Sequence, residues 1–169
     1  KYFTSSFPLD YGNWLAQEQD ASSGYNLDQA KQLLVDSGWS YKNKYWQKKE
    51  NYKTQRLQLN LLVKASDGSN VAVAENIRTQ LENQGIRINI VKASDEQYTD
   101  NLNNKKYDIA LCSLTLSPSP SLETFFGAGN LSNYTTEEIT NIMNEVKNTT
   151  DENVLKEKYT RLIEIYKTE

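Results

Sequence analysis

The side chains that could do chemistry in this chain exclude more reactions than they suggest. Its 169 residues include no His and a single Cys, which excludes catalytic triads that use His, most zinc and nickel sites, and thiolate clusters. Glu137 and Glu138 resemble an acid/base pair, but next to a helix start they interact favourably with the helix macrodipole instead. We therefore expect no catalytic residue, no metal and no cofactor, and we interpret Cys112 as an inert buried thiol.

Uncharged polar side chains are better candidates for a binding role. Asn130, Asn133 and Tyr134 can donate and accept hydrogen bonds without burying a net charge, which suits recognition of peptide amides. The same residues also suit a turn that leads into a helix, because the segment from Asn133 to Thr136 is typical of a helix start. The turn and capping interpretation is favoured, and the binding role is kept beside it.

Composition bounds the kind of protein that must position these residues. A chain of 169 residues can bury roughly 70% of its unfolded surface, so it needs no disulfide framework. No apolar run approaches the roughly 18 to 20 residues of a membrane helix, and no signal-like region opens the chain. The net charge is −3 and the basic residues are scattered, so we expect no nucleic-acid partner.

The central part of the chain alternates between two hydrophobic periods. Period-two patterns predict strands over 57–63, 86–91 and 107–114, and helical spacing predicts helices over about 70–84 and 94–102. Gly85 is expected to hold a left-handed helix C-cap. The fold class is therefore α/β, a three-layer-like lobe with a mainly parallel or mixed sheet flanked by helices.

In the segments on either side of this central part, capping residues, glycines and prolines mark where elements begin and end. Residues 1–25 are predicted to be an irregular lead-in, and 26–169 a single domain that begins with a helix capped by Asn26 and ended by Gly38. Residues 41–55 suit an exposed hairpin, whose aromatic residues either anchor it or stack on a ligand; these residues are Trp39, Tyr41, Tyr45 and Trp46. The Ser-Pro-Ser-Pro segment at 117–120 stops the sheet, and helices are expected over 136–148 and 152–166.

Four segments, in order, carry a resemblance. They are 25–39, 74–86, the Tyr-Asp strand at 107–110, and 130–143 followed by 150–152 and 158–159. Together they resemble the second lobe of the family 5 extracellular solute-binding proteins, the oligopeptide- and dipeptide-type receptors of bacterial ABC importers. The resemblance covers roughly residues 5 to 166.

The resemblance implies a two-lobed, flytrap-like protein of the periplasmic-binding-protein type, lipid-anchored or free outside the membrane. Such a protein closes on a peptide or peptide-like small ligand and presents it to ABC permease subunits. In the family the chain returns to the first lobe after the last helix, so we expect this sequence to be an excised lobe. Its many Asn, Lys and Tyr residues are typical of an AT-rich Gram-positive source. A sensory module of the same fold and an enzyme are the alternatives.

The resemblance also implies where the ligand lies. In the family, residues just past the Tyr-Asp strand line the cleft, and an open α/β sheet binds ligands beyond the carboxyl ends of its strands. The alternative is that this segment simply packs in the core. With the two candidates above, the predicted ligand-binding residues are Ser113, Leu114, Thr115, Ser117, Asn130 and Tyr134.

One position departs from the family. Oligopeptide receptors use an Asp after the Tyr-Asp strand to bind the α-ammonium of the ligand, and Ser117 stands at that position here. Residues 113–122 contain no acidic side chain. We therefore expect a ligand without a free amino terminus, such as a capped peptide or a glycoconjugate, or an amine bound by another carboxylate, with Glu123 the nearest.

Overall fold

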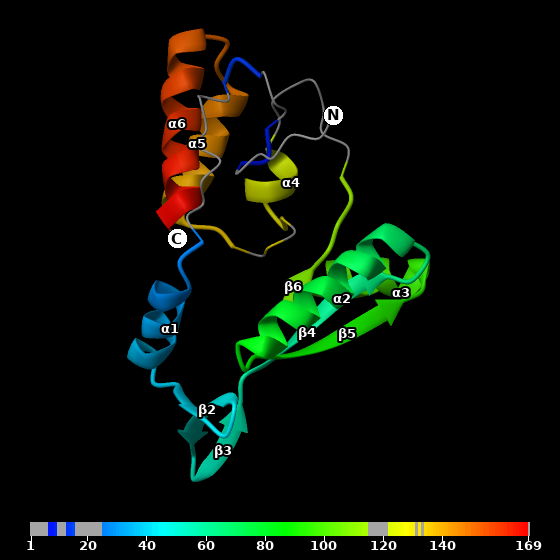
Figure 1. Ribbon diagram of the computed structural model, residues 1–169. Helices are drawn as coiled ribbons and strands as arrows, with labels where there is room; N and C mark the ends of the chain where they lie inside the picture. Colours follow the sequence, from blue (N-terminus) through cyan, green and yellow to red (C-terminus); the bar gives the residue numbers. More distant parts are fainter. Residues whose placement is uncertain are drawn as a thin grey trace. The chain divides into compact units, whose positions relative to one another are not determined.

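The structure is a computed structural model that describes residues 7–9, 13–15, 25–114, 122–130, 132 and 134–168 (Figure 1). The described residues group into two compact units. The first is the segment 25–113, and the second combines the described residues before 25 with those after 113. The boundary between Ser113 and Leu114 falls inside the segment 26–169 that the sequence analysis treats as one domain.

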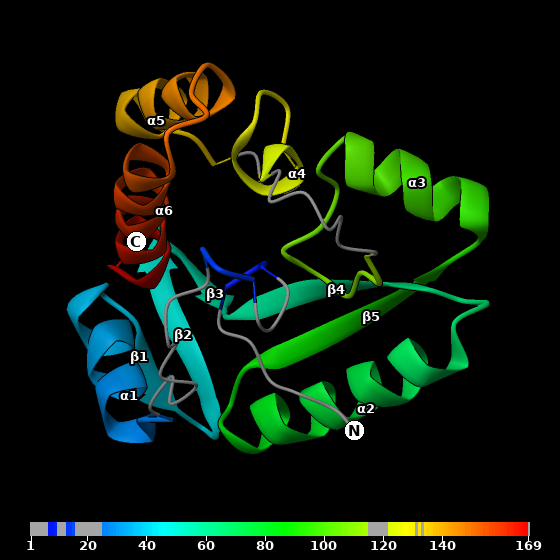
Figure 2. The ribbon, with the colours of Figure 1, turned by 90° about the horizontal axis from the view of Figure 1, so that it is seen from above.

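The 25–113 unit contains two three-stranded sheets. Its elements are α1 (Leu27–Asp36), β1 (Ser40–Lys42), β2 (Tyr45–Glu50), β3 (Lys53–Arg56), β4 (Gln58–Lys64), α2 (Gly68–Asn83), β5 (Arg87–Ala93), α3 (Asp95–Asn103) and β6 (Ile109–Ala110). The first sheet is antiparallel in the order β1-β2-β3, and the second is parallel in the order β5-β4-β6. Helices α2 and α3 lie on opposite sides of the parallel sheet (Figure 2), as predicted for an α/β lobe.

Strand β4 forms the centre of the parallel sheet. Leu61, Leu62 and Val63 have no exposed surface, because one face of β4 packs against α2 and the other lies under α3. A strand that is covered on both faces needs a continuous apolar run, and 61–63 supplies it.

The helix boundaries follow from their caps. Asn26 Oδ1 accepts a hydrogen bond from Gln29 N at 2.9 Å, and Gly38 has a φ of 85°, which confirms both predicted ends of the α1 region. Asp67 caps α2 through the Asn70 N–H, at 3.0 Å. Ser94 begins α3 with a capping box, in which its side chain and that of Gln97 bond each other's backbone N–H.

The predicted third strand is wrong in its length. It was expected over 107–114, but β6 contains only Ile109–Ala110, and 111–114 are not a strand. Leu111 N still donates to Leu62 O at 3.0 Å, whereas the Leu111 carbonyl accepts the Tyr98 hydroxyl at 2.7 Å. The ladder ends there, and the Leu111 carbonyl oxygen bonds a side chain instead of a backbone N–H.

The antiparallel sheet is a meander with two tight turns. Asn43 and Lys44 have φ values of 53° and 67°, and Asn51 and Tyr52 have 48° and 64°. Two consecutive positive φ angles are typical of type I′ turns, which match the twist of the strands. Trp46 is 4% exposed and donates from Nε1 to the backbone oxygen at the C-cap of α2, at 2.9 Å, so an aromatic residue does anchor the hairpin.

The second unit is helical where it is described. Its elements are α4 (Glu123–Phe126), α5 (Glu137–Lys147) and α6 (Glu152–Thr168). The helices expected over 136–148 and 152–166 are confirmed, and the short α4 was not predicted. Phe7, Leu9 and Leu15 of the lead-in are buried in the same core as α5 and α6. The segment at 117–120 lies outside the described residues, and none of the described helices is long and apolar enough to cross a membrane.

Gly85 provides a test of the junction between the two sheets. Its φ is 83°, and a Cβ there would lie 2.5 Å from the Tyr41 ring and 2.9 Å from the Lys44 carbonyl oxygen. We expect Gly85→Val to lower the free energy of unfolding by about 2–4 kcal/mol, from a strained backbone plus overpacking. Urea unfolding of the chain measures this.

Gly68→Ala is the matched control. No atom lies within 4 Å of a Cβ at this position, and Gly68 is in a helix, so we expect no loss of stability. Equal urea midpoints for Gly85→Val and the unaltered chain would contradict the assigned left-handed cap.

Candidate functional site

The carboxyl ends of the parallel strands bring polar side chains together at one edge of the sheet. Ser66 and Asp67 follow β4, Ser113 follows β6, and Asn70 lies in the first turn of α2. In open α/β sheets this edge is where unpaired backbone groups and helix N-termini face a ligand. We therefore take this edge as the candidate site of the 25–113 unit.

Asp67, Asn70 and Ser113 form the centre of the edge. The Asn70 amide nitrogen donates to Asp67 Oδ2 at 2.9 Å and lies 3.1 Å from Ser113 Oγ. Ser113 Oγ also approaches Asp67 Oδ2, at 3.4 Å. Asp67 and Asn70 are half-buried, and Ser113 is exposed. The cluster thus links residues 43 to 46 positions apart and holds a hydroxyl at the surface, where it can bond an amide of a ligand.

Tyr98 supports this edge from α3. Its hydroxyl donates to the Leu111 carbonyl at 2.7 Å and lies 3.2 Å from Cys112 Sγ. Burial, and then the hydrogen bond with Cys112, raise the pKa of the Tyr98 phenol, so it remains a neutral donor. We expected Cys112 to be an inert buried thiol, and it is half-buried and lies against the Tyr98 hydroxyl.

An ion pair fixes the start of α3 to the end of β4. Lys64 Nζ lies 2.9 Å from Asp95 Oδ2, and the Ser66 hydroxyl donates to Asp95 Oδ1 at 2.7 Å. The Lys64 hydrogen bond, and then that of Ser66, lower the pKa of Asp95. The two crossover connections of the sheet therefore begin from polar contacts at the same edge.

The sequence-predicted ligand residues fall into different units. Ser113 lies at the edge described above, whereas Leu114, Asn130 and Tyr134 belong to the other unit, where Leu114 is 47% exposed. Thr115 and Ser117 lie outside the described residues. A ligand role for any of the six residues stays a prediction.

Asn130 is committed to its own loop. It is 5% exposed, and its amide nitrogen donates to the carbonyl oxygens of Gly127 and Tyr134, at 3.1 and 2.7 Å. Ser132 Oγ donates to Asn130 Oδ1 at 2.8 Å. The turn interpretation of Asn130 is thus confirmed, and Thr136 caps α5 by accepting from Ile139 N at 3.2 Å.

Two of the three acidic residues singled out in the second unit are paired with cations. Glu138 accepts two hydrogen bonds from the Arg161 guanidinium, at 2.6 and 3.2 Å, which lower its pKa. Glu123 Oε1 lies 2.8 Å from Lys147 Nζ. Among the described residues, no group of three or more His, Cys, Asp or Glu side chains is arranged to hold a metal ion.

Sequence reasoning missed Asp67, Asn70 and Tyr98. The Asp-Gly pair at 67–68 is typical of the end of a strand, but an Asp at that place also caps a helix and faces the binding edge. Tyr98 lies within the helix expected over 94–102, but nothing local indicates that its hydroxyl bonds Leu111, 13 residues along the chain.

An apolar groove occupies a different part of the same unit. It has a volume of about 560 Å³ and lies between α1, the C-terminal end of α2 and the Trp46 side chain. Leu27, Leu34, Leu81 and Ile86 are among its lining residues. Because α2 runs antiparallel to the strands, this groove lies toward their amino ends and is distinct from the candidate site.

Comparison with known proteins places these features in a family. The sequence profile of the bacterial extracellular solute-binding proteins, family 5, middle domain, matches residues 2–133. No curated protein sequence matches the chain.

Three solved structures share the fold. The oligopeptide-binding protein AppA from Bacillus subtilis, in complex with a nonapeptide, has a TM-score of 0.79 at 19% identity, over 98% of this chain and 34% of that one. An oligopeptide-binding protein from Thermus thermophilus, complexed with a pentapeptide, has a TM-score of 0.83 at 15% identity. The match covers 97% of this chain and 31% of that one. A mannohexaose-bound periplasmic oligopeptide-binding protein from Thermotoga maritima has a TM-score of 0.72 at 18% identity. The match covers 85% of this chain and 29% of that one. The chain thus spans about a third of the length of these proteins.

The Tyr98 hydroxyl gives the candidate site a test in alkaline solution. Its folded-state pKa is raised above the ordinary 10.0, so above about pH 10 the unfolded chain releases a proton that the folded chain keeps. Stability must then fall as pH rises. We expect the fall in unfolding free energy between about pH 9 and 11 to be shallower in Tyr98→Phe.

Urea titrations at each pH measure this slope. Tyr107 and Tyr159, whose pKa values are also raised by burial, keep part of the slope in the variant. Tyr52→Phe is the control, because that side chain is 97% exposed and should leave the profile unchanged. Identical slopes for Tyr98→Phe and the unaltered chain would mean that the buried Tyr98 hydrogen bond is not formed.

Proposed function

Because this chain belongs to family 5 of the bacterial extracellular solute-binding proteins, we propose that it is one lobe of a peptide-type receptor of an ABC importer. The lobe captures its ligand outside the membrane, and the closed receptor delivers it to a permease. The whole receptor has a second lobe and is held at the membrane by a lipid anchor. Two of the structural neighbours were solved with bound peptides, which supports a peptide or peptide-like ligand.

The observation that carries this proposal is the polar edge formed by Asp67, Asn70 and Ser113. It lies where parallel strands end, and its hydroxyl and amide groups can bond the backbone of an extended peptide. Leu114, Thr115, Ser117, Asn130 and Tyr134 stay predicted ligand residues and are not among the three residues of this edge. The lobe binds and does no covalent chemistry, so closure of the receptor is the functional event.

The ligand class follows from the charges available. The segment 113–122 carries no acidic residue, and Glu123, the next one along the chain, lies against Lys147. The carboxylate at the polar edge is Asp67, which already accepts hydrogen bonds from the backbone and side-chain nitrogens of Asn70. A free α-ammonium would have to compete with these partners for a charge-assisted bond, which is among the strongest single contacts. We propose that the receptor accepts ligands without a free amino terminus, such as capped peptides or glycoconjugates.

Calorimetry tests the proposal with tri- to pentapeptides, each offered free and N-acetylated. We expect the complete two-lobed protein to bind acetylated peptides at least as tightly as free ones, and this chain alone to bind more weakly than micromolar, because only one side of the cleft is present. Ser113→Ala in the complete protein should weaken binding about threefold to tenfold, the worth of one neutral hydrogen bond.

Ser40→Ala is the matched control. Ser40 Oγ donates to the Gln47 carbonyl within the meander, away from the candidate site, so affinity should not change. If no peptide binds the complete protein, the proposed function is wrong. A tenfold or greater preference for the free amine that survives Glu123→Gln would contradict the ligand class alone.

A further inference from the structure

The meander β1-β2-β3 concentrates positive charge in a chain whose net charge is −3. Residues 40–56 carry six Lys and Arg side chains against one Glu, for a net charge of +5. The 25–113 unit as a whole has 13 Lys and Arg against 10 Asp and Glu, so the rest of the chain is acidic. The distribution of charge is therefore strongly uneven along the sequence.

Strand register sorts these side chains onto two faces. Lys42 pairs with Tyr45, Gln47 with Arg56, and Lys49 with Thr54, and residues directly opposite each other share a face. The other face holds Tyr41, Trp46, Lys48, Glu50 and Lys53, and it contacts the end of α2 through Trp46. The face opposite Trp46, which we call the basic face, thus carries three cations and no acidic residue.

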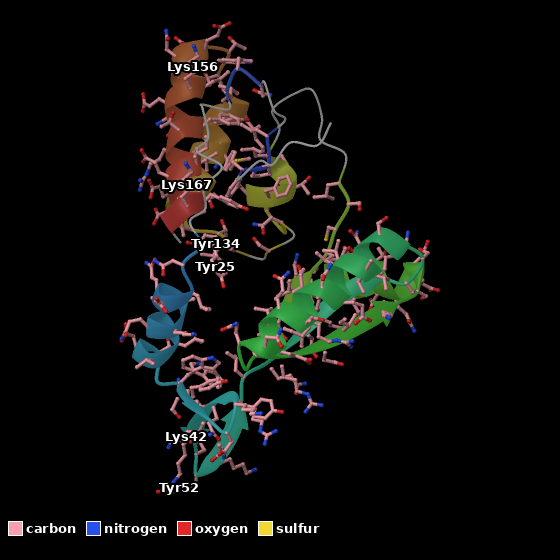
Figure 3. All side chains as sticks on the ribbon, in the orientation of Figure 1. Tyr25, Lys42, Tyr52, Tyr134, Lys156 and Lys167 are labelled. Atoms are coloured by element: carbon pink, nitrogen blue, oxygen red, sulfur yellow. The ribbon has the colours of Figure 1, made fainter. Side chains whose placement is uncertain are left out.

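The cations of the basic face are available to a partner. Lys42, Lys49 and Arg56 are exposed, and none of them forms an ion pair with any residue in the described part of the chain. The Arg56 guanidinium carbon lies over the Tyr45 ring, 4.4 Å from its centre, which is a cation–π contact on this face. Tyr52, at the tip of the β2-β3 hairpin, is 97% exposed and points away from the ribbon (Figure 3).

We propose that the basic face docks the protein on an anionic phospholipid surface. Clustered Lys and Arg residues attract anionic headgroups, and exposed Tyr side chains prefer the boundary between water and lipid. Acidic residues that lie more than about 10 Å from the lipid surface oppose this only weakly, because charges at that distance are screened at 0.1 M salt. The choice of a membrane over other polyanions rests on the proposed function, which brings the receptor beside a membrane permease.

Sedimentation with lipid vesicles tests this inference on the 169-residue chain. We expect the chain to bind phosphatidylcholine vesicles that contain phosphatidylglycerol, and not pure phosphatidylcholine vesicles, with affinity that falls as salt rises. The triple variant Lys42→Gln, Lys49→Gln, Arg56→Gln should bind about 100-fold more weakly, at roughly fivefold for each cation removed.

The matched control is Lys31→Gln, Lys48→Gln, Lys53→Gln, which removes the same charge from α1 and from the opposite face of the meander. It should keep most of the vesicle binding. Equal losses in the two triple variants, or binding to soluble polyphosphate but not to vesicles, would overturn the proposal. Peptide affinity of the complete protein should not change in either variant, so failure here would leave the proposed function standing.

Discussion

The burial of β4 on both faces is the constraint on which the 25–113 unit depends. Leu61, Leu62 and Val63 have no exposed surface, and each buried side chain of this size contributes roughly 1.5–3 kcal/mol. Because β5 and β6 pair with β4 in parallel, each connection must cross a face of the sheet, and α2 and α3 supply the two covers. The parallel arrangement also requires the strands to end at one edge.

The candidate site follows from that common edge. Asp67 caps α2 and accepts from the Asn70 side chain, while the Tyr98 hydroxyl bonds the Leu111 carbonyl just after β6, and Ser113 lies outside the sheet. The cap of α2, the end of β6 and the exposed Ser113 hydroxyl therefore lie together at one edge of the sheet. In the proposed receptor this edge would form one side of the cleft, and closure would come from movement between lobes.

The sequence predicted most of what depends on local patterns. Asn26, Gly38 and Gly85 marked helix ends correctly because capping and positive φ are properties of a few neighbouring residues. The short β6 was not predicted, and the contacts beyond it join residues far apart in sequence, since Tyr98 bonds Leu111 and the polar edge joins Asp67 to Ser113 across 46 positions. Periodicity carries no information on such long-range hydrogen bonds.

The central claim is that the ligand meets the carboxyl-end edge of the β5-β4-β6 sheet. Nuclear magnetic resonance of the ¹⁵N-labelled chain, titrated with a millimolar mixture of tri- to pentapeptides, tests it even when binding is weak. Amide shifts concentrated at residues 66–70 and 111–113 are the result that we predict, with little change at 84–87. Shifts confined to the groove between α1 and α2, with none at 66–70 or 111–113, would contradict the claim.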